Sequence, residues 1–338
     1  MARPSSQGQD AYDLPDLRRI GQLHGRLFSS SGDFAAIPDL LSERLLQRLD
    51  TLAMCPATVL DLGCTSDYRL NALHQRFPDA NILGACWSSS GLSRLSSTTA
   101  TATAPESGLR NKLSRALAGI LKFLPFPGFA ASAKKPWSVI TALPDQLPLP
   151  DSSIELVIAS QVLPWCQDPG AVFKEMHRVL APGGAFFWSG AGPDTLREYR
   201  AIWQQIDHYP HVWGLRDMHD LGDDMLRCGF SAPVMDRENL TLQYSSVDAL
   251  VADLRANALV NIAAGRRRGL MSREVAERLD AAAKSLSPDA GESLDVTFEL
   301  IQGHGWKAEP SPVAENRDPT VIKVPIDTIA RKSANKLD

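Results

Sequence analysis

The sequence predicts an α/β fold with a mostly parallel sheet and helices on both of its faces. The first observation is an apolar run, 58–62, that breaks at Gly63. The second is the segment after it, in which Leu70, Leu73 and Phe77 recur at helical spacing. The third is that further apolar runs alternate with helical patterns along the chain, which predicts parallel pairing with right-handed crossovers.

The glycine turn after 58–62 is the first candidate ligand site. Gly63 lets a ligand approach the backbone closely, and the helix that follows places the positive end of its dipole beside the turn. Two interpretations are open: a turn that binds a ligand, or a tight turn of an α/β domain that binds none.

The remaining elements follow from periodicity and from the residues that end each one. Pro182 cannot continue a helix and Gly183 permits a left-handed cap, so the preceding helix ends there. Ser88 is a candidate cap for the helix after the second strand. The expected strands are 58–62, 81–86, 139–140, 154–159, 185–189, 239–244 and 295–302, the last at an edge of the sheet. The expected helices are 37–52, one after Gly63, one after Ser88, 169–180, 194–207, 219–228, 246–257 and 272–286.

Composition excludes several classes of protein. The 338 residues can bury a large core, and 35 basic against 39 acidic residues carry no global signature of nucleic-acid binding. No apolar run approaches the length of a membrane span and the N-terminus lacks a signal-peptide pattern, so we expect a cytoplasmic protein without an integral membrane segment. The 5 cysteines lack CxxC spacing, so we expect buried small residues rather than disulfides or a zinc site.

One large domain is expected between two flexible ends. Residues 1–35 are polar, and 307–338 combine prolines with mixed charge, a composition typical of loosely ordered segments. The domain spans 36–306. Within it, 208–290 is rich in helical patterns and is expected to form the substrate side.

Residues 96–136 are interpreted as an insertion, because the segment begins rich in Ser, Thr and Ala and ends with Pro125, Pro127 and Gly128. Apolar residues recur within it at helical spacing. Such a basic amphipathic segment meets an acidic partner or an anionic membrane surface, or it is a lid helix with a solvated face. Its basic residues are Arg110, Lys112, Arg115, Lys122, Lys134 and Lys135.

Four segments, in this order, resemble class I S-adenosylmethionine-dependent methyltransferases. They are Val-Leu-Asp-Leu-Gly-Cys at 59–64, the Leu-Pro segment at 147–157, Glu-Met-His-Arg-Val-Leu at 175–180 and Ala-Pro-Gly-Gly at 181–184. The resemblance implies a Rossmann-like fold with a seven-stranded, mostly parallel sheet. It also implies S-adenosylmethionine as the cofactor.

Further motifs resemble the biotin-synthesis branch of that family, the malonyl-[acyl-carrier protein] O-methyltransferases, whose relatives include a mitochondrial complex I assembly factor. The resemblance covers 36–306 apart from the insertion, and it implies methylation of the free carboxylate of a malonyl thioester. An acyl-carrier protein is then the implied partner. The motifs are Gly-Pro-Asp-Thr-Leu-Arg-Glu at 192–198, Asp-Met-His-Asp-Leu-Gly-Asp at 217–223, Gly-Phe at 229–230, Pro-Val-Met-Asp at 233–236 and Thr-Phe-Glu at 297–299.

The resemblance places cofactor binding at Asp61, Gly63, Cys64, Thr65, Cys86, Trp87, Leu143 and Ser160. Three places depart from the family's pattern. Thr65 and Asp67 stand where the family has glycines. Cys86 replaces an acid that takes the ribose hydroxyls, and Leu143 replaces an aspartate beside the adenine. Each lost contact costs about 1 to 3 kcal/mol, because a polar group of the ligand then goes unpaired.

Two side chains in the motifs of the biotin-synthesis branch have alternative roles. Arg197 is a candidate for the malonyl carboxylate, or it forms a surface ion pair with Asp194 or Glu198. His219 has acidic neighbours, but a helix start with acids near its dipole explains that pattern without a metal.

Two main functional hypotheses remain at this stage, beside the option that a different small ligand binds in the same crevice. The first is an S-adenosylmethionine-dependent O-methyltransferase that acts on a malonyl thioester in biotin synthesis. The second is a non-catalytic member that has lost cofactor binding and serves as an interaction or assembly module.

Overall fold

The computed structural model describes residues 14–16, 20, 23, 36–64, 67–87, 136–256, 259–269, 271–286 and 293–309. All of these residues except Glu309 belong to one compact unit, Met1–Ala308. The described strands are β1 (Thr58–Leu62), β2 (Asn81–Cys86), β3 (Trp137–Thr141), β4 (Ile154–Ser160), β5 (Leu180–Ala191), β6 (Phe230–Tyr244) and β7 (Leu294–Lys307). The described helices are α3 (Ala36–Arg48), α4 (Asp67–Arg76), α7 (Pro169–Val179), α8 (Arg197–Gln204), α9 (Met218–Arg227), α10 (Val247–Ala256) and α11 (Arg273–Leu286), with short 3₁₀ turns η1 (Leu49–Thr51) and η2 (Leu163–Trp165).

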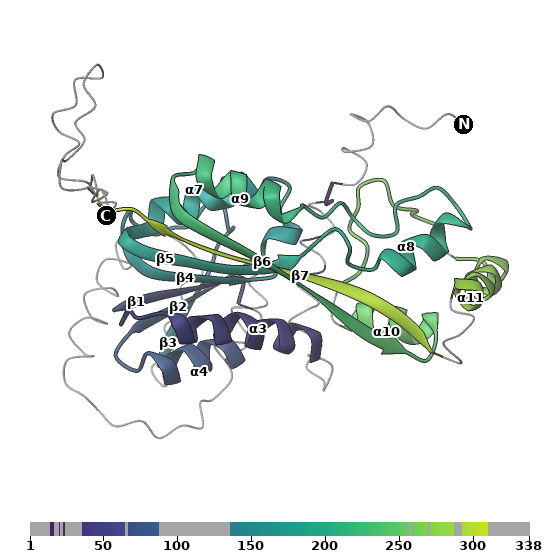
Figure 1. Ribbon diagram of the computed structural model, residues 1–338, viewed down its shortest axis with the longest axis horizontal. Coiled ribbons are helices and arrows are strands. Elements are labelled where there is room, and N and C mark those ends of the chain that lie inside the picture. Colours follow the sequence, from purple (N-terminus) through teal and green to yellow (C-terminus); the bar gives the residue numbers. More distant parts are fainter. Residues whose placement is uncertain are drawn as a thin grey trace, which may run out of the picture. The chain divides into compact units, whose positions relative to one another are not determined.

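The strands form one seven-stranded sheet in the order β3-β2-β1-β4-β5-β7-β6 (Figure 1). The first five strands in this order pair in parallel, and β7 runs antiparallel to both β5 and β6. β1 and β4 are almost continuously buried, as strands of a parallel sheet covered on both faces must be. The predicted α/β fold with a mostly parallel seven-stranded sheet is confirmed.

Helices cover both faces of this sheet, with α7 and α9 on one side and α3 and α4 on the other (Figure 1). On the first side, Phe173 of α7 and Met225 of α9 are buried with Trp188 of β5. On the second side, Leu45 of α3 and Leu70 of α4 are buried against the opposite face. The helix expected after the glycine turn is therefore α4, and its apolar stripe attaches it to the sheet.

The long β6–β7 pair carries a helical part of the same unit. At its far end lie α8, α10 and α11 (Figure 1), around a core that includes Trp203 and Leu250. Ile20 and Leu23 are buried in that core too. The segment 1–35, expected to be flexible, thus contributes two core side chains that the sequence did not predict.

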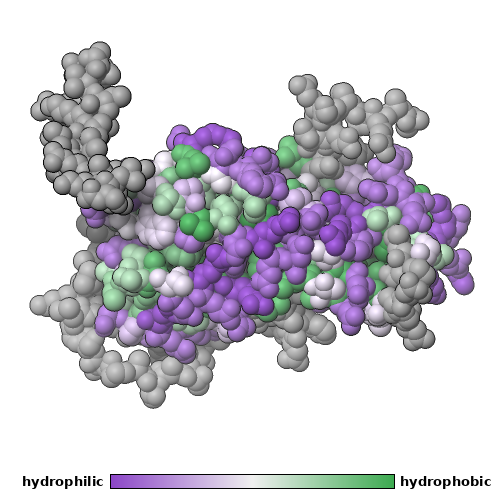
Figure 2. All heavy atoms as spheres, in the orientation of Figure 1, coloured by the Kyte–Doolittle hydropathy of each residue, from purple (hydrophilic) through white to green (hydrophobic). Residues whose placement is uncertain are grey.

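The outer face of the edge strand β6 is charged. Figure 2 shows a hydrophilic band along the β6–β7 pair. Asp236 and Glu238 of β6 form ion pairs with Arg48 and Arg44 of α3. Charges on an edge strand oppose its pairing with the strands of other molecules. Within the described ranges, no helix is both long and apolar enough to cross a membrane.

Several details differ from expectation. β5 spans Leu180–Ala191, so it starts directly after α7 and extends beyond the expected 185–189 at both ends. α8 begins at Arg197 because Leu196 before it has a left-handed φ of 59°. The expectation that the last strand is an edge strand was wrong: β7 lies between β5 and β6, and β6 is the edge. A pattern of buried faces does not reveal how many neighbours a strand has.

Ser88 and nearly all of the expected insertion 96–136 lie outside the described residues. The predicted cap and the basic segment therefore stay predictions.

Candidate active site

The carboxyl ends of β1 and β4 are the expected place for a ligand, because the strand order reverses between these two neighbours. β1 leads into Gly63, whose φ is +72°. A Cβ atom at Gly63 would lie 2.5 Å from Cγ2 of Val162, so only glycine fits. The N–H groups of Gly63 and Cys64 both donate to the carbonyl oxygen of Ala85, over 2.8 and 3.2 Å. The turn therefore directs these two donors to β2.

A buried ion pair lies beneath this turn. Nε of Arg69, in the first turn of α4, donates to Oδ1 of Asp61 over 2.7 Å, and Asp61 is 0% exposed. The same guanidinium contacts the hydroxyl of Ser42 and the carbonyl oxygen of Gly63. Burial raises the pKa of the Asp61 carboxyl, and the charge and hydrogen bond of Arg69 oppose that shift. Among the described residues, Oδ2 of Asp61 has no hydrogen-bond partner.

Cys64 and Cys86 are fully buried on the same side of the sheet as this pair. The thiol of Cys86 donates to the carbonyl oxygen of Ile140 over 3.3 Å. The hydrogen-bonding interaction with Cys86, followed by burial and the charge of Asp61, raises the pKa of the Cys64 thiol well above its usual value. Two neutral, buried thiols supply no strong acceptor for a ligand.

A pocket of about 490 Å³ lies at the carboxyl ends of β2 and β3. Trp87, Leu143 and Pro148 give it apolar walls, and Leu143 is 53% exposed there. Oγ1 of Thr141 is buried in the wall and has no partner within the described ranges. Apolar walls with two polar side chains, Thr141 and Gln146, suit a planar heteroaromatic ring. The structure thus brings together Trp87 and Leu143, two of the expected cofactor residues.

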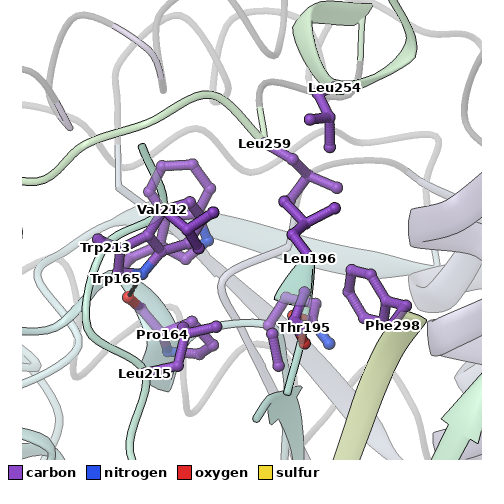
Figure 3. A pocket seen from close by; sticks show the side chains of 12 residues that line it. Pro164, Trp165, Thr195, Leu196, Val212, Trp213, Leu215, Leu254, Leu259 and Phe298 are labelled. Atoms are coloured by element: carbon purple, nitrogen blue, oxygen red, sulfur yellow. Dashed lines mark hydrogen bonds between the residues drawn. The ribbon is translucent and has the colours of Figure 1, made fainter. Parts of the chain in front are cut away.

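A second, narrow pocket lies at the end of β4, with a volume of about 20 Å³. Figure 3 shows its apolar side chains converging from η2, β7, α10 and the loops around α8. The expected site residue Ser160 is buried beside it and hydrogen-bonded to Ser189. The labelled lining residues are Pro164, Trp165, Thr195, Leu196, Val212, Trp213, Leu215, Leu254, Leu259 and Phe298.

Gln161 lines this second pocket and was not predicted from the sequence. Its φ of 57° is left-handed, a strained conformation that is common in functional sites. Its side-chain Nε2 is buried and lacks a partner in the described part of the chain. The only sequence signal was a polar residue directly after an apolar strand.

The other expected site residues lie elsewhere. Arg197 is 55% exposed and pairs with Glu198 over 2.9 Å, which is the surface ion pair that the sequence allowed. His219 is 79% exposed beside Asp217. In the described ranges no group of three or more His, Cys, Asp or Glu side chains could hold a metal ion. Thr65 lies outside the described residues.

S-adenosylmethionine fits these residues in part. Its adenine suits the apolar pocket around Trp87 and Leu143. Its ammonium group would need acceptors such as Asp61 and the Gly63 carbonyl, and Arg69 contacts both. Its ribose finds no carboxylate at the end of β2, because Cys86 stands there. The amino-acid end of the cofactor would therefore share these acceptors with Arg69.

Similarity to known proteins covers most of the chain and not only the candidate cofactor residues. A family model described as a methyltransferase domain matches residues 60–188. The malonyl-[acyl-carrier protein] O-methyltransferase of Laribacter hongkongensis is 33% identical over 297 residues, 88% of this chain and 91% of that protein. The enzyme of the same name from a Methylovorus species is 33% identical over 300 residues, 89% of this chain and 92% of that protein. This chain belongs to the family of the malonyl-[acyl-carrier protein] O-methyltransferases.

Proposed function

We propose that this protein transfers a methyl group from S-adenosylmethionine to the free carboxylate of a malonyl group carried on an acyl-carrier protein, as a step of biotin synthesis. One observation carries the proposal. The similarity to malonyl-[acyl-carrier protein] O-methyltransferases covers 88% of the chain. A match of that extent includes much of the helical part on β6 and β7 as well as the sheet shared by many methyltransferases.

The chemistry asks little of the protein's side chains. S-adenosylmethionine supplies, when bound, a methyl group that is already activated as a sulfonium. A carboxylate is ionised at neutral pH, so its oxygen needs no general base. The chain's task is to align that oxygen and to exclude water. Trp165, Trp213 and Phe298 form an apolar wall suited to the second requirement.

Gln161 is the proposed holder of the substrate carboxylate. Its Nε2 offers a neutral, buried donor at the narrow pocket. A neutral amide holds one carboxylate oxygen without the strong pairing that a cation would impose, so the other oxygen stays nucleophilic. Arg197, which already pairs with Glu198, is the competing candidate.

The reaction is tested with purified protein, methyl-labelled S-adenosylmethionine and malonyl-acyl-carrier protein. We expect label on the malonyl group. Acetyl-acyl-carrier protein is the matched control, because it lacks the free carboxylate and should stay unlabelled. Absence of label at millimolar cofactor, under conditions in which a related enzyme from the family is active, would refute the proposal.

Replacing Gln161 tests the substrate contact. We expect Gln161→Leu to lower kcat/KM by about 10- to 100-fold, since a hydrogen bond to a charged group contributes about 1.5 to 3 kcal/mol. Arg197→Leu should leave it within about twofold, as expected for an exposed ion pair. The reverse pattern would move the substrate carboxylate to Arg197. Steady-state kinetics with malonyl-acyl-carrier protein decides between them.

A second candidate function is a non-catalytic member that binds a partner without the cofactor. The observation that favours it is Cys86, whose buried thiol donates to Ile140 where a ribose would need a carboxylate. No binding of S-adenosylmethionine at millimolar concentration would favour this candidate.

For both candidate functions, the basic insertion 96–136 is the proposed contact for an acidic partner such as an acyl-carrier protein. Neutral substitutions of its basic residues should weaken the binding of that partner.

A further inference from the structure

Arg69 is a buried cation that the proposed methyl transfer does not use. Its side chain is 6% exposed. It donates from Nε to Oδ1 of Asp61 over 2.7 Å, from Nη1 to Oγ of Ser42 over 3.1 Å and from Nη2 to the carbonyl oxygen of Gly63 over 3.4 Å. Two of these three acceptors belong to the end of β1, where the cofactor is expected.

The same acceptors are those that a cationic ligand would need. An ammonium group carries three donors and no acceptor, so it binds carboxylate and carbonyl oxygens. With Arg69 in place, such a ligand would bring a second positive charge into a site from which water is largely excluded. The internal cation therefore opposes the entry of an external one.

The geometry of the pair also leaves a vacant position. Nε of Arg69 meets a single oxygen of Asp61, whereas an arginine and a carboxylate often form two parallel hydrogen bonds. Oδ2 of Asp61 is buried and has no partner among the residues that the structure describes. A buried carboxylate oxygen without a donor is a place where a ligand's N–H group would be stabilised.

We propose that Arg69 is an internal competitor for the ammonium group of S-adenosylmethionine. In the free protein it holds Asp61 and the Gly63 carbonyl, and it lowers the affinity for every ligand that brings a cation to them. Ligands that lack the amino-acid end are unaffected. The identity of the cofactor rests on the proposed function, whereas the competition itself rests on the contacts of Arg69.

The test is calorimetric titration of the full chain with three ligands: S-adenosylmethionine, S-adenosylhomocysteine and 5′-methylthioadenosine, which lacks the amino-acid end. Arg69→Met removes the charge. Arg69→Gln removes the charge but keeps a donor for Asp61, and it serves if the first variant does not fold. Arg69→Lys keeps the charge. Arg76→Met is the matched control, because Arg76 lies in the last turn of the same helix and pairs with Asp50.

We expect Arg69→Met and Arg69→Gln to bind the first two ligands at least tenfold more tightly than the wild type, with 5′-methylthioadenosine changed by less than twofold. Arg69→Lys and Arg76→Met should match the wild type. The proposal is overturned if neither neutral variant binds more tightly, if 5′-methylthioadenosine gains as much as S-adenosylmethionine, or if no variant binds at millimolar ligand.

The methyl-transfer assay separates this outcome from that of the proposed function. Tighter binding in Arg69→Gln without methylation of malonyl-acyl-carrier protein by any variant would support the competition and refute the activity. Methylation by the wild type, with an affinity that does not depend on Arg69, would support the activity and refute the competition.

Discussion

Asp61 is a buried carboxylate whose charge the fold has to compensate, and it lies where the cofactor is proposed to bind. Its carboxylate is fully buried, and Arg69 compensates its charge. Removing one partner of a buried ion pair typically costs about 3 to 5 kcal/mol, because the remaining charge is then uncompensated. A variant that keeps a donor at position 69 is therefore expected to be more stable than one that does not.

The half-buried His304 gives a prediction about pH. Burial, followed by the charge of Arg48, lowers the pKa of His304 below 6.5. The folded protein then binds fewer protons than the unfolded chain just below pH 6.5, so the histidine's contribution to stability is complete above that pH and is lost as the pH falls. His304→Phe keeps the stacking on Phe187, whose ring centroid is 4.8 Å away.

We therefore expect the free energy of unfolding of His304→Phe, measured in urea, to fall less between pH 7 and pH 5 than that of the wild type. His219→Gln, at an exposed position, should follow the wild type. An equally steep loss in His304→Phe would show that other groups cause the acid sensitivity.

At the scale of elements, the antiparallel β5–β7 pair includes a close packing contact at one glycine. Gly303 of β7 lies opposite Trp188 of β5, and a Cβ atom there would lie 2.6 Å from the indole ring. Trp188 is 0% exposed, so its ring has no free space to move into. This contact helps to explain why β7 can pair with β5 in the interior of the sheet.

Two glycine-to-alanine substitutions test that packing. We expect Gly303→Ala to lower the free energy of unfolding by about 1 to 3 kcal/mol through overpacking. Gly222→Ala, in α9, meets its nearest side chain at an ordinary 3.4 Å and should raise it by about 0.5 to 1 kcal/mol through helix propensity. Urea denaturation measures both. A neutral Gly303→Ala would mean that Trp188 can shift.

At the scale of the whole molecule, the chain divides into Met1–Ala308 and Glu309–Asp338. β7 reaches Lys307, one residue beyond the expected domain end at 306, and Nζ of Lys307 donates to the carbonyl oxygen of Leu180 over 2.7 Å. The end of β7 is thus attached to the start of β5 within the unit Met1–Ala308.

A chain that ends at Ala308 should therefore unfold in one transition with the urea midpoint of the full chain. The full-length protein is the control. A lower midpoint in the shortened chain would assign residues 309–338 a part in the fold.

By itself the sequence determined the α/β class, the strand, turn and helix around Gly63, and the family, because apolar periodicity and ordered motifs are local properties of the chain. It also indicated Trp87 and Leu143, which the structure places in one pocket. The expectations for Thr65 and for the insertion 96–136 stay predictions, because Thr65 and nearly all of the insertion lie outside the described residues.

Only the tertiary structure decided which polar groups meet. Arg69 reaches Ser42 across 27 residues of sequence, and Thr195 reaches the backbone of Glu299 across 104. Such partners depend on how helices and strands pack, and the left-handed conformation of Gln161 depends on the structure around it. Periodicity records which side chains are buried, but it carries no information on the distant group that each buried side chain will contact.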